Sequence, residues 1–325
     1  MTAPMDYRSH VQNSSQRRLR SKGIVQYSSF GTWGWLDSCN AEVKKEIEVY
    51  AGDIRDAYDV RSSMKNIVSV LHLAALVSIP YSYQSPSSYI DTNVRGTLNL
   101  LQAAKDYGVH KFVHTSSSEV YGSAQYVPMD EKHPLVGQSP YSASKIAADQ
   151  LALSFYTSFE LPVITLRPFN TFGPRQSARA IIPNIISQIL SGLKTIRVGS
   201  VEPTRDFTYV TDTALGFLSC LKATQGYGEV FNLGSKFEIS IKTLVETISG
   251  LMHVDVELMS MDERIRPKNS EVERLYADNS KLIQSLGWNP KFASEKGFVE
   301  GLRHTIDWFS MPNNLKLYKP DLYNI

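Results

Sequence analysis

The first residues with an evident chemical use are Tyr141 and Lys145, which stand four positions apart. If this segment opens a helix, both side chains lie on the same helix face. An ammonium group beside a phenol lowers the phenol pKa from its usual value of about 10. The resulting phenolate can take the proton of a hydroxyl group while a hydride leaves the same carbon. Taken alone, this spacing is more often a half-exposed surface pair.

A run of small hydroxyl residues favours the chemical interpretation of that pair. The segment Lys111–Thr115 is typical of a strand, and Ser116, Ser117, Ser118 and Glu119 follow it directly. A parallel α/β sheet presents its reacting groups at the carboxyl ends of its strands. We therefore expect Ser117, Ser118 and Glu119 to lie beside the tyrosine–lysine pair and to share in its chemistry.

The elements that must hold these groups follow from the order of the apolar segments. Short β-rich runs alternate with longer segments whose apolar residues recur at helical spacing. Strands joined by helical crossovers pair in parallel, and the helices cover both faces of the sheet. The sequence therefore predicts an α/β fold with a doubly wound (Rossmann-type) parallel sheet. The predicted strands are 46–50, 67–73, 111–114 and 162–166, and the predicted helices are 93–107 and 142–159.

The pattern changes after Arg167 and Pro168. This change predicts a smaller C-terminal α/β domain at the carboxyl ends of the strands, where it would close over a substrate. The later segments are a loop at 170–179, a helix near 180–193 and shorter elements at 195–198, 229–233, 241–252 and 254–258. The sheet domain is predicted to span residues 1–168, and residues 205–235 are predicted to return to it. The substrate-binding domain is predicted to comprise residues 169–204 and 236–312, and residues 313–325 are predicted to form a tail.

The composition excludes several classes of protein. Lys and Arg total 34 against 32 Asp and Glu, so we expect no polyanion-binding surface and no nucleic-acid partner. Two cysteines, Cys39 and Cys220, are too few for a disulfide framework or a cysteine-based zinc site, and no metal site is predicted. No apolar run reaches the roughly 18 residues that a membrane span needs, and no signal-peptide pattern is present. We therefore expect a cytoplasmic protein with reduced thiols and no membrane partner.

The strand-end serines, Tyr141 and Lys145 together resemble the serine–tyrosine–lysine centre of the extended short-chain dehydrogenases/reductases, the NAD-dependent epimerase/dehydratase family. The resemblance runs from about residue 26 to the end of the chain. The segments that show it are Gly-Asp-Ile-Arg-Asp (52–56), His-Leu-Ala-Ala (72–75), Asn-Val-Arg-Gly-Thr (93–97), Arg-Pro-Phe-Asn-Thr-Phe-Gly-Pro-Arg (167–175), Arg-Asp-Phe-Thr-Tyr-Val (205–210) and Asn-Leu-Gly (232–234).

This resemblance implies a bound NAD and a nucleotide-sugar substrate. The sheet domain would then be the NAD-binding domain, and helices 93–107 and 142–159 would form the family's homodimer surface. The implied cofactor-binding residues are Asp53 and Ile54 at the adenine, Leu73, Ala74 and Ala75 along the cofactor, and Tyr141 and Lys145 at the nicotinamide ribose. The implied substrate-binding residues are Asn170, Arg175, Arg205 and Arg266. Arginine forks suit the oxygens of a nucleotide diphosphate.

Glu119 distinguishes the reactions that the family performs. After hydride removal from C4 of the sugar, a 4-epimerase returns the hydride to C4. A 4,6-dehydratase instead needs a base for the C5 proton, so that water leaves from C6. Glu119 matches the position of that base in the dehydratases that the chain resembles. Ser118 precedes Glu119, as in the GDP-mannose type of enzyme, whereas the deoxythymidine-diphosphate-glucose enzymes have Asp at that position. The resemblance therefore implies that Glu119 both accepts the C5 proton and delivers it to the leaving hydroxyl.

The chain most closely resembles one subfamily, the UDP-N-acetylglucosamine 4,6-dehydratases of the legionaminic-acid pathway. The matching segments are 33–35, 118–122, 176–180, 266–267 and 270–272. UDP-glucuronate decarboxylases, which also have a Ser-Glu pair at this strand end, and nucleotide-sugar 4-epimerases remain alternatives. Decarboxylation would need an extra cation for the substrate carboxylate, and the sequence identifies none. The alternative of another class is an inactive remnant or binding protein that cannot hold NAD.

The first 24 residues depart from the family pattern. A first strand and a Gly-x-x-Gly-x-x-Gly turn are expected there, because backbone N–H groups and a helix N-terminus meet the pyrophosphate. No glycine precedes Gly23, Pro4 has no N–H, and Arg8 stands where the third glycine belongs. Single-base deletions in a sequence that encodes the expected turn reproduce Thr2–His10. We therefore hypothesise that the first strand and the Gly-rich loop are missing or scrambled, and that NAD binding is weakened.

Overall fold

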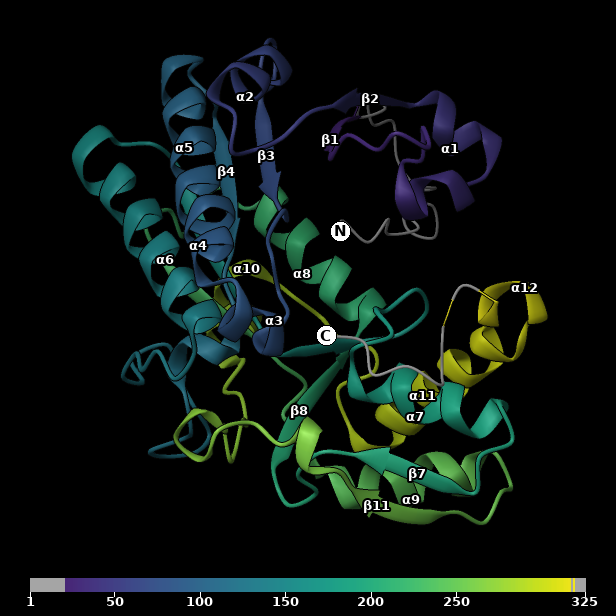
Figure 1. The fold of residues 1–325 in the computed structure, drawn as a ribbon. Helices are drawn as coiled ribbons and strands as arrows, with labels where there is room; N and C mark the ends of the chain where they lie inside the picture. Colours follow the sequence, from purple (N-terminus) through teal and green to yellow (C-terminus); the bar gives the residue numbers. More distant parts are fainter. Residues whose placement is uncertain (1–20, 317, 319–325) are drawn as a thin grey trace.

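The largest sheet has four parallel strands in the order β3-β4-β5-β9 (Figure 1). The computed structural model describes residues 21–316 and 318. The strands are β3 (Ser69–His72), β4 (Lys111–Thr115), β5 (Val163–Pro168) and β9 (Val230–Leu233). β4 and β5 are buried along nearly their whole length because helices cover both faces of the sheet. This parallel sheet confirms the α/β, Rossmann-type fold class that the sequence predicts.

Two sets of helices cover the two faces of this sheet. Neighbouring residues of β4 show the division, because Phe112 packs in a cluster with α5 and α6, whereas Val113 packs with α8 and α10. The flanking helices are α2 (Ala57–Ser63), α5 (Gly96–Asp106), α6 (Pro140–Phe159), α8 (Val210–Lys222) and α10 (Ser280–Leu286). The chain passes from β3 to α5 through the short helices α3 (Ile79–Gln84), α4 (Pro86–Tyr89) and η3 (Ile90–Arg95).

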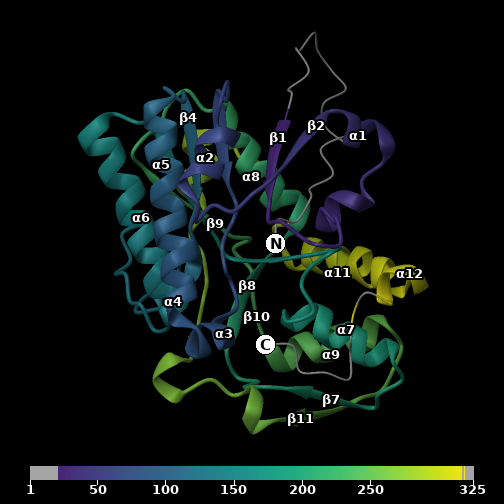
Figure 2. The same cartoon turned by 45° about the horizontal axis from the view of Figure 1, so that its top comes forward.

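A separate sheet contains the first two described strands. β1 (Ser21–Val25) and β2 (Ile47–Ala51) pair in parallel, and η2 (Gly34–Ser38) and α1 (Ala41–Lys45) join them. Within the described part of the chain, β1 forms no hydrogen-bonded ladder with β3. Figure 2 shows the β1–β2 pair set apart from the large sheet. The parallel strands are therefore interrupted between β1 and β3.

The predicted loss of the first strand and Gly-rich loop concerns residues 1–24. Residues 1–20, which include Pro4 and Arg8, lie outside the described residues, so that part stays a prediction. Residues 21–24 form most of β1 and pair with β2. Ordinary strand structure thus begins before Val25, where the sequence is expected to resume the family pattern.

A smaller α/β region is built on two further sheets. β6 begins directly after β5 ends, which attaches this region at the carboxyl end of the large sheet. One sheet has the order β10-β8-β6, and β7 pairs with β11 in the other. The strands are β6 (Asn170–Phe172), β7 (Thr195–Val198), β8 (Thr204–Tyr209), β10 (Glu238–Ser240) and β11 (Glu257–Ser260). The helices are α7 (Ile181–Leu190), α9 (Ile241–Leu251), α11 (Glu295–Ser310) and α12 (Pro312–Leu315).

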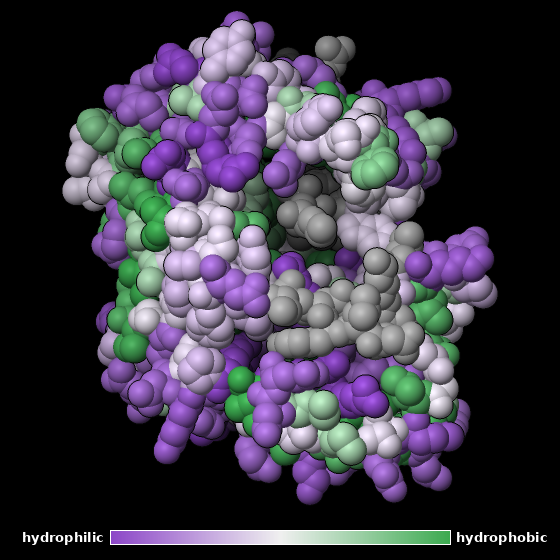
Figure 3. All heavy atoms as spheres, in the orientation of Figure 1, coloured by the Kyte–Doolittle hydropathy of each residue, from purple (hydrophilic) through white to green (hydrophobic). Residues whose placement is uncertain are grey.

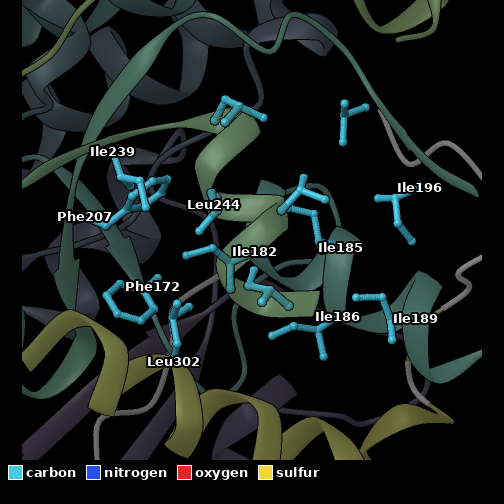
Figure 4. Close-up of a cluster of buried hydrophobic side chains, with 14 of the residues drawn as sticks. Phe172, Ile182, Ile185, Ile186, Ile189, Ile196, Phe207, Ile239, Leu244 and Leu302 are labelled. Atoms are coloured by element: carbon cyan, nitrogen blue, oxygen red, sulfur yellow. The ribbon is translucent and has the colours of Figure 1, made fainter. Parts of the chain in front are cut away.

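The smaller region has its own apolar core because each of its longer helices presents one apolar face. Ile182 and Ile185 of α7 pack with Leu244 of α9, Leu302 of α11 and Phe207 of β8. Figure 4 shows these side chains converging between the helices and the sheet. Burying one such side chain contributes roughly 1.5–3 kcal/mol, so this cluster stabilises the region apart from the large sheet.

The observed elements differ from the predicted ones mainly in the second half of the chain. The stretch 170–179, predicted as a loop, contains β6, and the short element predicted at 254–258 lies three residues later as β11, Glu257–Ser260. Two elements within 205–235 belong to the large sheet, because α8 packs on β4 and β5, and β9 is one of its strands. β8, in contrast, pairs with β6 and β10 of the smaller region. The domain boundaries stay a prediction. No described helix is both long and apolar enough to cross a lipid bilayer.

Candidate active site

Tyr141 and Lys145 lie at the beginning of α6. The helix begins there because Ser139 caps it, accepting the Ser142 N–H at 3.1 Å, while the Ser142 hydroxyl accepts the Ser139 N–H at 2.9 Å. Pro140 occupies the first turn, where a missing N–H costs little. Tyr141 and Lys145 are only 7% and 3% exposed. They are therefore a buried pair and not a surface pair.

The carboxyl end of β4 holds the other predicted groups. Lys145 Nζ donates a hydrogen bond to the carbonyl of Thr115, the last residue of the strand. Ser117 then caps the short helix η4 (Ser118–Tyr121), and its hydroxyl accepts the Glu119 N–H at 3.2 Å. The first two residues of η4 are both buried. The structure thus brings the strand-end serines and the glutamate to the beginning of α6, as the sequence predicts.

Burial controls the protonation of the tyrosine–lysine pair. It lowers the pKa of Lys145 to about 8, while the charge of Asp149 acts in the opposite direction. Burial also raises the pKa of Tyr141, although a hydrogen bond from Ser117 lowers it. The lowered tyrosine pKa that the sequence suggests is therefore outweighed by desolvation of the phenolate. A phenolate at this position needs the nearby positive charge to be preserved.

A charged cluster lies beside Glu119. Arg266 Nη1 is 4.0 Å from Glu119 Oε2 and 3.7 Å from Glu271 Oε1. Arg205 Nη2 donates to the same Glu271 oxygen at 3.2 Å, and its Nη1 donates to the Thr204 carbonyl at 2.9 Å. Burial lowers the pKa of Arg205, while the two carboxylates raise it. The predicted base and two of the predicted substrate-binding arginines thus belong to one cluster.

The other predicted substrate-binding residues, Asn170 and Arg175, lie on β6 and just after it. Asn170 is paired with Phe207 of β8, the strand that also contains Arg205. Arg175 adopts a positive φ of 66°, and its Nε is buried with no hydrogen-bond partner. Arg266 Nη1 is likewise buried without a hydrogen-bond partner. Unpartnered buried donors are costly, so these nitrogens suit an anionic ligand such as a diphosphate.

The residues expected along NAD before α6 are divided between the β1–β2 pair and the large sheet. Asp53 and Ile54 follow β2, and the Asp53 carboxylate accepts hydrogen bonds from the Arg55 guanidinium. The Ile54 side chain is buried against Gly96 of α5, where an added Cβ would lie 2.6 Å from the isoleucine Cδ1. Three other residues expected along the cofactor lie in the irregular segment after β3 and are half-buried, namely Leu73, Ala74 and Ala75.

The sequence patterns assign no role to several buried residues around this site, although Asn93 stands in the segment 93–97 that shows the resemblance. Asn93 Oδ1 accepts the Leu76 N–H at 2.8 Å, and its Nδ2 donates to Ser144 Oγ at 3.0 Å. This side chain therefore fastens the segment after β3 to α6. The Tyr89 ring packs edge-on against the Tyr141 ring, with centroids 6.2 Å apart. A polar asparagine on the inner face of a predicted helix is the signal that points to such a role.

A second polar network surrounds Asp149, one helical turn after Lys145 on α6. The carboxylate accepts hydrogen bonds from His114 Nε2 at 3.1 Å and from Ser116 Oγ at 2.7 Å. Arg167 donates to it from Nε at 3.1 Å and from Nη2 at 3.0 Å. All three partner residues are buried. The network joins α6 to the ends of β4 and β5. It lies one helical turn further along α6 than Lys145.

Comparison with known proteins places this chain in a family. The sequence model of the GDP-mannose 4,6 dehydratase family matches residues 11–300. A dTDP-glucose 4,6-dehydratase from Streptomyces antibioticus is 36% identical over 259 residues, which cover 79% of this chain and 75% of that protein.

Solved structures show the same fold in dehydratases and epimerases. A UDP-N-acetylglucosamine 4-epimerase from Methanobrevibacter ruminantium M1, in complex with UDP-N-acetylmuramic acid, matches with a TM-score of 0.78 and 32% identity, covering 89% of this chain and 90% of that chain. A dTDP-glucose 4,6-dehydratase from Streptomyces venezuelae, with NAD and TYD bound, matches with a TM-score of 0.79 and 27% identity, covering 91% and 89%. The chain therefore belongs to the NAD-dependent epimerase/dehydratase family of extended short-chain dehydrogenases/reductases.

Proposed function

We propose that this protein is an NAD-dependent nucleotide-sugar 4,6-dehydratase and that UDP-N-acetylglucosamine is its substrate. The observation that supports the reaction type is the position of Glu119, a buried carboxylate at the end of β4 whose charge acts on Tyr141. A base at this place is needed for 4,6-dehydration and is not needed for 4-epimerisation. The segments 33–35 and 176–180, which resemble the UDP-N-acetylglucosamine enzymes, support the choice of sugar.

The described residues fit two parts of an NAD molecule. Tyr141 and Lys145 would hold the nicotinamide ribose, and Asp53 and Ile54 would border the adenine. Thr115 Oγ1, at the end of β4, is buried with no hydrogen-bond partner, as expected where a polar ligand completes a site. The pyrophosphate-binding turn is expected within residues 1–24, of which 1–20 lie outside the described part. In this chemistry NAD supplies a reversible hydride acceptor, so the overall reaction consumes no cofactor.

The roles of the protein groups follow from their positions. Tyr141 takes the proton of the C4 hydroxyl as the C4 hydrogen departs as hydride, and Lys145 stabilises the phenolate by its charge. Ser117 holds the C4 oxygen by a hydrogen bond. The new ketone acidifies the C5 hydrogen, which Glu119 removes as a proton and delivers to the C6 hydroxyl, so that water leaves. The hydride then returns to C6 while C5 takes up a proton, which balances the proton that Tyr141 took from the C4 hydroxyl, so that the net change is the loss of one water.

The substrate diphosphate would be held by arginines of the smaller region. Arg205 lies on β8 and shares Glu271 with Arg266, while Arg175 presents a buried Nε without a partner. Arginines bind phosphate oxygens through paired N–H groups, which makes this set suitable for two linked phosphates. Asn170, on the strand beside β8, would contribute an amide hydrogen bond to the same end of the substrate.

One observation favours a second candidate, UDP-glucuronate decarboxylase. That reaction requires a cation for the C6 carboxylate of its substrate, and the sequence alone identifies none. Arg266 Nη1, 4.0 Å from Glu119 Oε2, is a cation close to the carboxylate that would act on C5 and C6 of the sugar. The two proposals therefore assign different ligands to Arg266, the diphosphate in one and the sugar carboxylate in the other.

The experiment that tests the proposal offers the purified chain several nucleotide-sugars and measures the product and the bound NAD. A 4-keto-6-deoxy product from UDP-N-acetylglucosamine supports the dehydratase. Carbon dioxide from UDP-glucuronate, with UDP-N-acetylglucosamine unchanged, establishes the decarboxylase, and interconversion of 4-epimers establishes an epimerase. A chain that binds these nucleotides but retains no NAD after purification is a binding protein. Glu119→Gln is the matched control, because it removes the base and preserves the size of the side chain.

We also propose that the protein is a homodimer that uses α5 and α6. Large apolar side chains remain exposed on these helices, namely Leu98 of α5 and Leu153, Tyr156 and Phe159 of α6. In Figure 3, apolar residues line the edge of the molecule where Figure 1 places α6. Contact with a second copy would remove this apolar surface from water.

The proposed location is the cytoplasm. Cys39 and Cys220 are free thiols, and proteins of oxidising compartments generally pair their cysteines. The proposed small-molecule partner is the nucleotide-sugar, and the balanced charge of the chain supports no nucleic-acid partner.

A further inference from the structure

Two members of the charged cluster, Arg266 and Glu271, lie on one loop, residues 266–271. The regular structure of this loop is the short 3-10 helix η6 (Lys268–Ser270). A helix of one turn does not hold its own position, because few hydrogen bonds repay the order that it needs. The place of both charged side chains therefore depends on the groups to which the loop is fastened.

The Gln138 side chain fastens this loop. Its Nε2 donates to the carbonyl of Asn269 at 3.1 Å and to the carbonyl of Glu271 at 3.2 Å. Its Oε1 accepts the N–H of Ser123 at 2.5 Å. All three partners are backbone groups with a fixed role as donor or acceptor, so they determine which end of the amide faces which segment. A carboxylate of the same shape could not donate to the two carbonyls.

Ser270 adds a second attachment to the same place. Its hydroxyl donates to the Gln138 carbonyl at 2.5 Å, and the residue is 9% exposed. The Tyr83 hydroxyl lies 2.6 Å from the Ser270 hydroxyl oxygen. Because the single proton of Ser270 is already used, Tyr83 is the donor of this hydrogen bond. The loop is therefore attached both to α3, which contains Tyr83, and to the segment before α6.

Gln138 stands where the elements of the candidate active site meet. It is separated from Tyr141 by two residues, the cap of α6 and the first residue of that helix. Its partner Ser123 lies just after η4, the short helix that contains Glu119. One side chain therefore joins the loop 266–271 to both of the elements that carry the proposed tyrosine and base.

We propose that Gln138 is a positioning residue: its amide docks the loop 266–271 and so holds Arg266 where the substrate diphosphate binds. This inference rests on the proposed function, in which arginines of the charged cluster bind the diphosphate. A loop that is undocked part of the time lowers the affinity in proportion to its docked fraction. A merely structural residue before α6 would affect the stability of that helix and leave the affinity for the nucleotide unchanged.

Gln138→Glu tests this inference with little change in shape. It replaces Nε2 by an oxygen that faces the carbonyls of Asn269 and Glu271, so both hydrogen bonds are lost. Hydrogen–deuterium exchange across residues 268–273 should become faster. The Kd for UDP, measured by isothermal titration calorimetry, should rise about tenfold, because each lost hydrogen bond changes the docking equilibrium by roughly threefold.

A second variant and a matched control accompany this test. Tyr83→Phe removes the donor to Ser270 and should raise the Kd for UDP by roughly threefold, which tests the inference even if Gln138→Glu does not fold. Gln225→Glu is the control, because the Gln225 amide also donates to a backbone carbonyl, that of Ser285, at 2.9 Å. This control should change neither the Kd nor the exchange across 268–273.

The inference requires the exchange and the affinity to change together. An unchanged Kd for UDP in Gln138→Glu and Tyr83→Phe, or a raised Kd without faster exchange across 268–273, would overturn it. A wild type that does not bind UDP would overturn both this inference and the proposed substrate. Because neither measurement uses the sugar, a protein that binds UDP but forms no 4-keto product contradicts only the proposed reaction.

Discussion

Lys145→Met should make the folded protein more stable at neutral pH, although it removes a reactive group. Folding lowers the Lys145 pKa from its usual 10.5 to about 8, because the ammonium is buried. At about 1.36 kcal/mol per pH unit, this corresponds to roughly 3.4 kcal/mol of cost for the charged lysine. The variant also loses the hydrogen bond to the Thr115 carbonyl, which lowers its free energy of unfolding by about 1 kcal/mol. Asp149 keeps Arg167 as its partner. The free energy of unfolding should therefore increase by about 2 kcal/mol.

The gain should depend on pH with a defined sign. The folded-state pKa of Lys145 lies below the unfolded one, so the cost of the lysine is complete below about pH 8 and disappears as the pH rises towards 10.5. Wild-type stability should therefore approach that of the variant across this window. Urea unfolding of both proteins, followed by circular dichroism at several pH values, measures the difference. A variant less stable than the wild type at neutral pH, or a difference that is constant with pH, would refute the reasoning.

Further predictions concern the base, helix packing and the proposed dimer. Glu119→Gln should slow product formation by about 10²–10⁴-fold, while reduced nicotinamide still forms and absorbs in the near ultraviolet; an unchanged rate would exclude Glu119 as the base. Gly297→Ala should destabilise the protein by about 2 kcal/mol, because an added Cβ would lie 2.6 Å from the Phe292 backbone. Gly250→Ala adds a Cβ that would meet nothing within 4 Å and should stabilise α9 by up to about 1 kcal/mol. Equal changes in the melting temperatures of the two glycine variants would contradict this packing account. Tyr156→Glu should give monomers in sedimentation, since the side chain is 38% exposed in one copy; an unchanged dimer would place the interface elsewhere.

The large sheet could be predicted because its strands and helices are determined locally. β4 is a short buried run, and α6 combines a capping serine with apolar residues at helical spacing. β6 could not be predicted, because it is a short strand whose pairing depends on β8, far along the chain. β11 is exposed along its whole length, so no apolar pattern fixes its position. Its ladder with β7 does so instead.

Local motifs also explain which site residues could be predicted. Tyr141 and Glu119 follow recognisable signals, a helix start and a strand end. Asp149 and Arg167 form a buried pair between α6 and β5, and such pairing is visible only in three dimensions. The protonation of Tyr141 could not be predicted either, because the residue types show the neighbouring lysine but not the desolvation that raises the phenol pKa.

The interruption between β1 and β3 has a consequence for how the molecule opens. β1 and β2 bury little beyond Val25 and pair only with each other within the described chain, whereas β4 is buried along its length. We expect amide protons of the β1–β2 pair to exchange with solvent through local opening, and those of β4 to exchange only on global unfolding. Asp53 belongs to the part that opens first, and Tyr141 to the part that opens last. With NAD bordered by Asp53 as proposed, retention of the cofactor would depend on the least stable segment, and warming should release NAD before the catalytic face loses its shape.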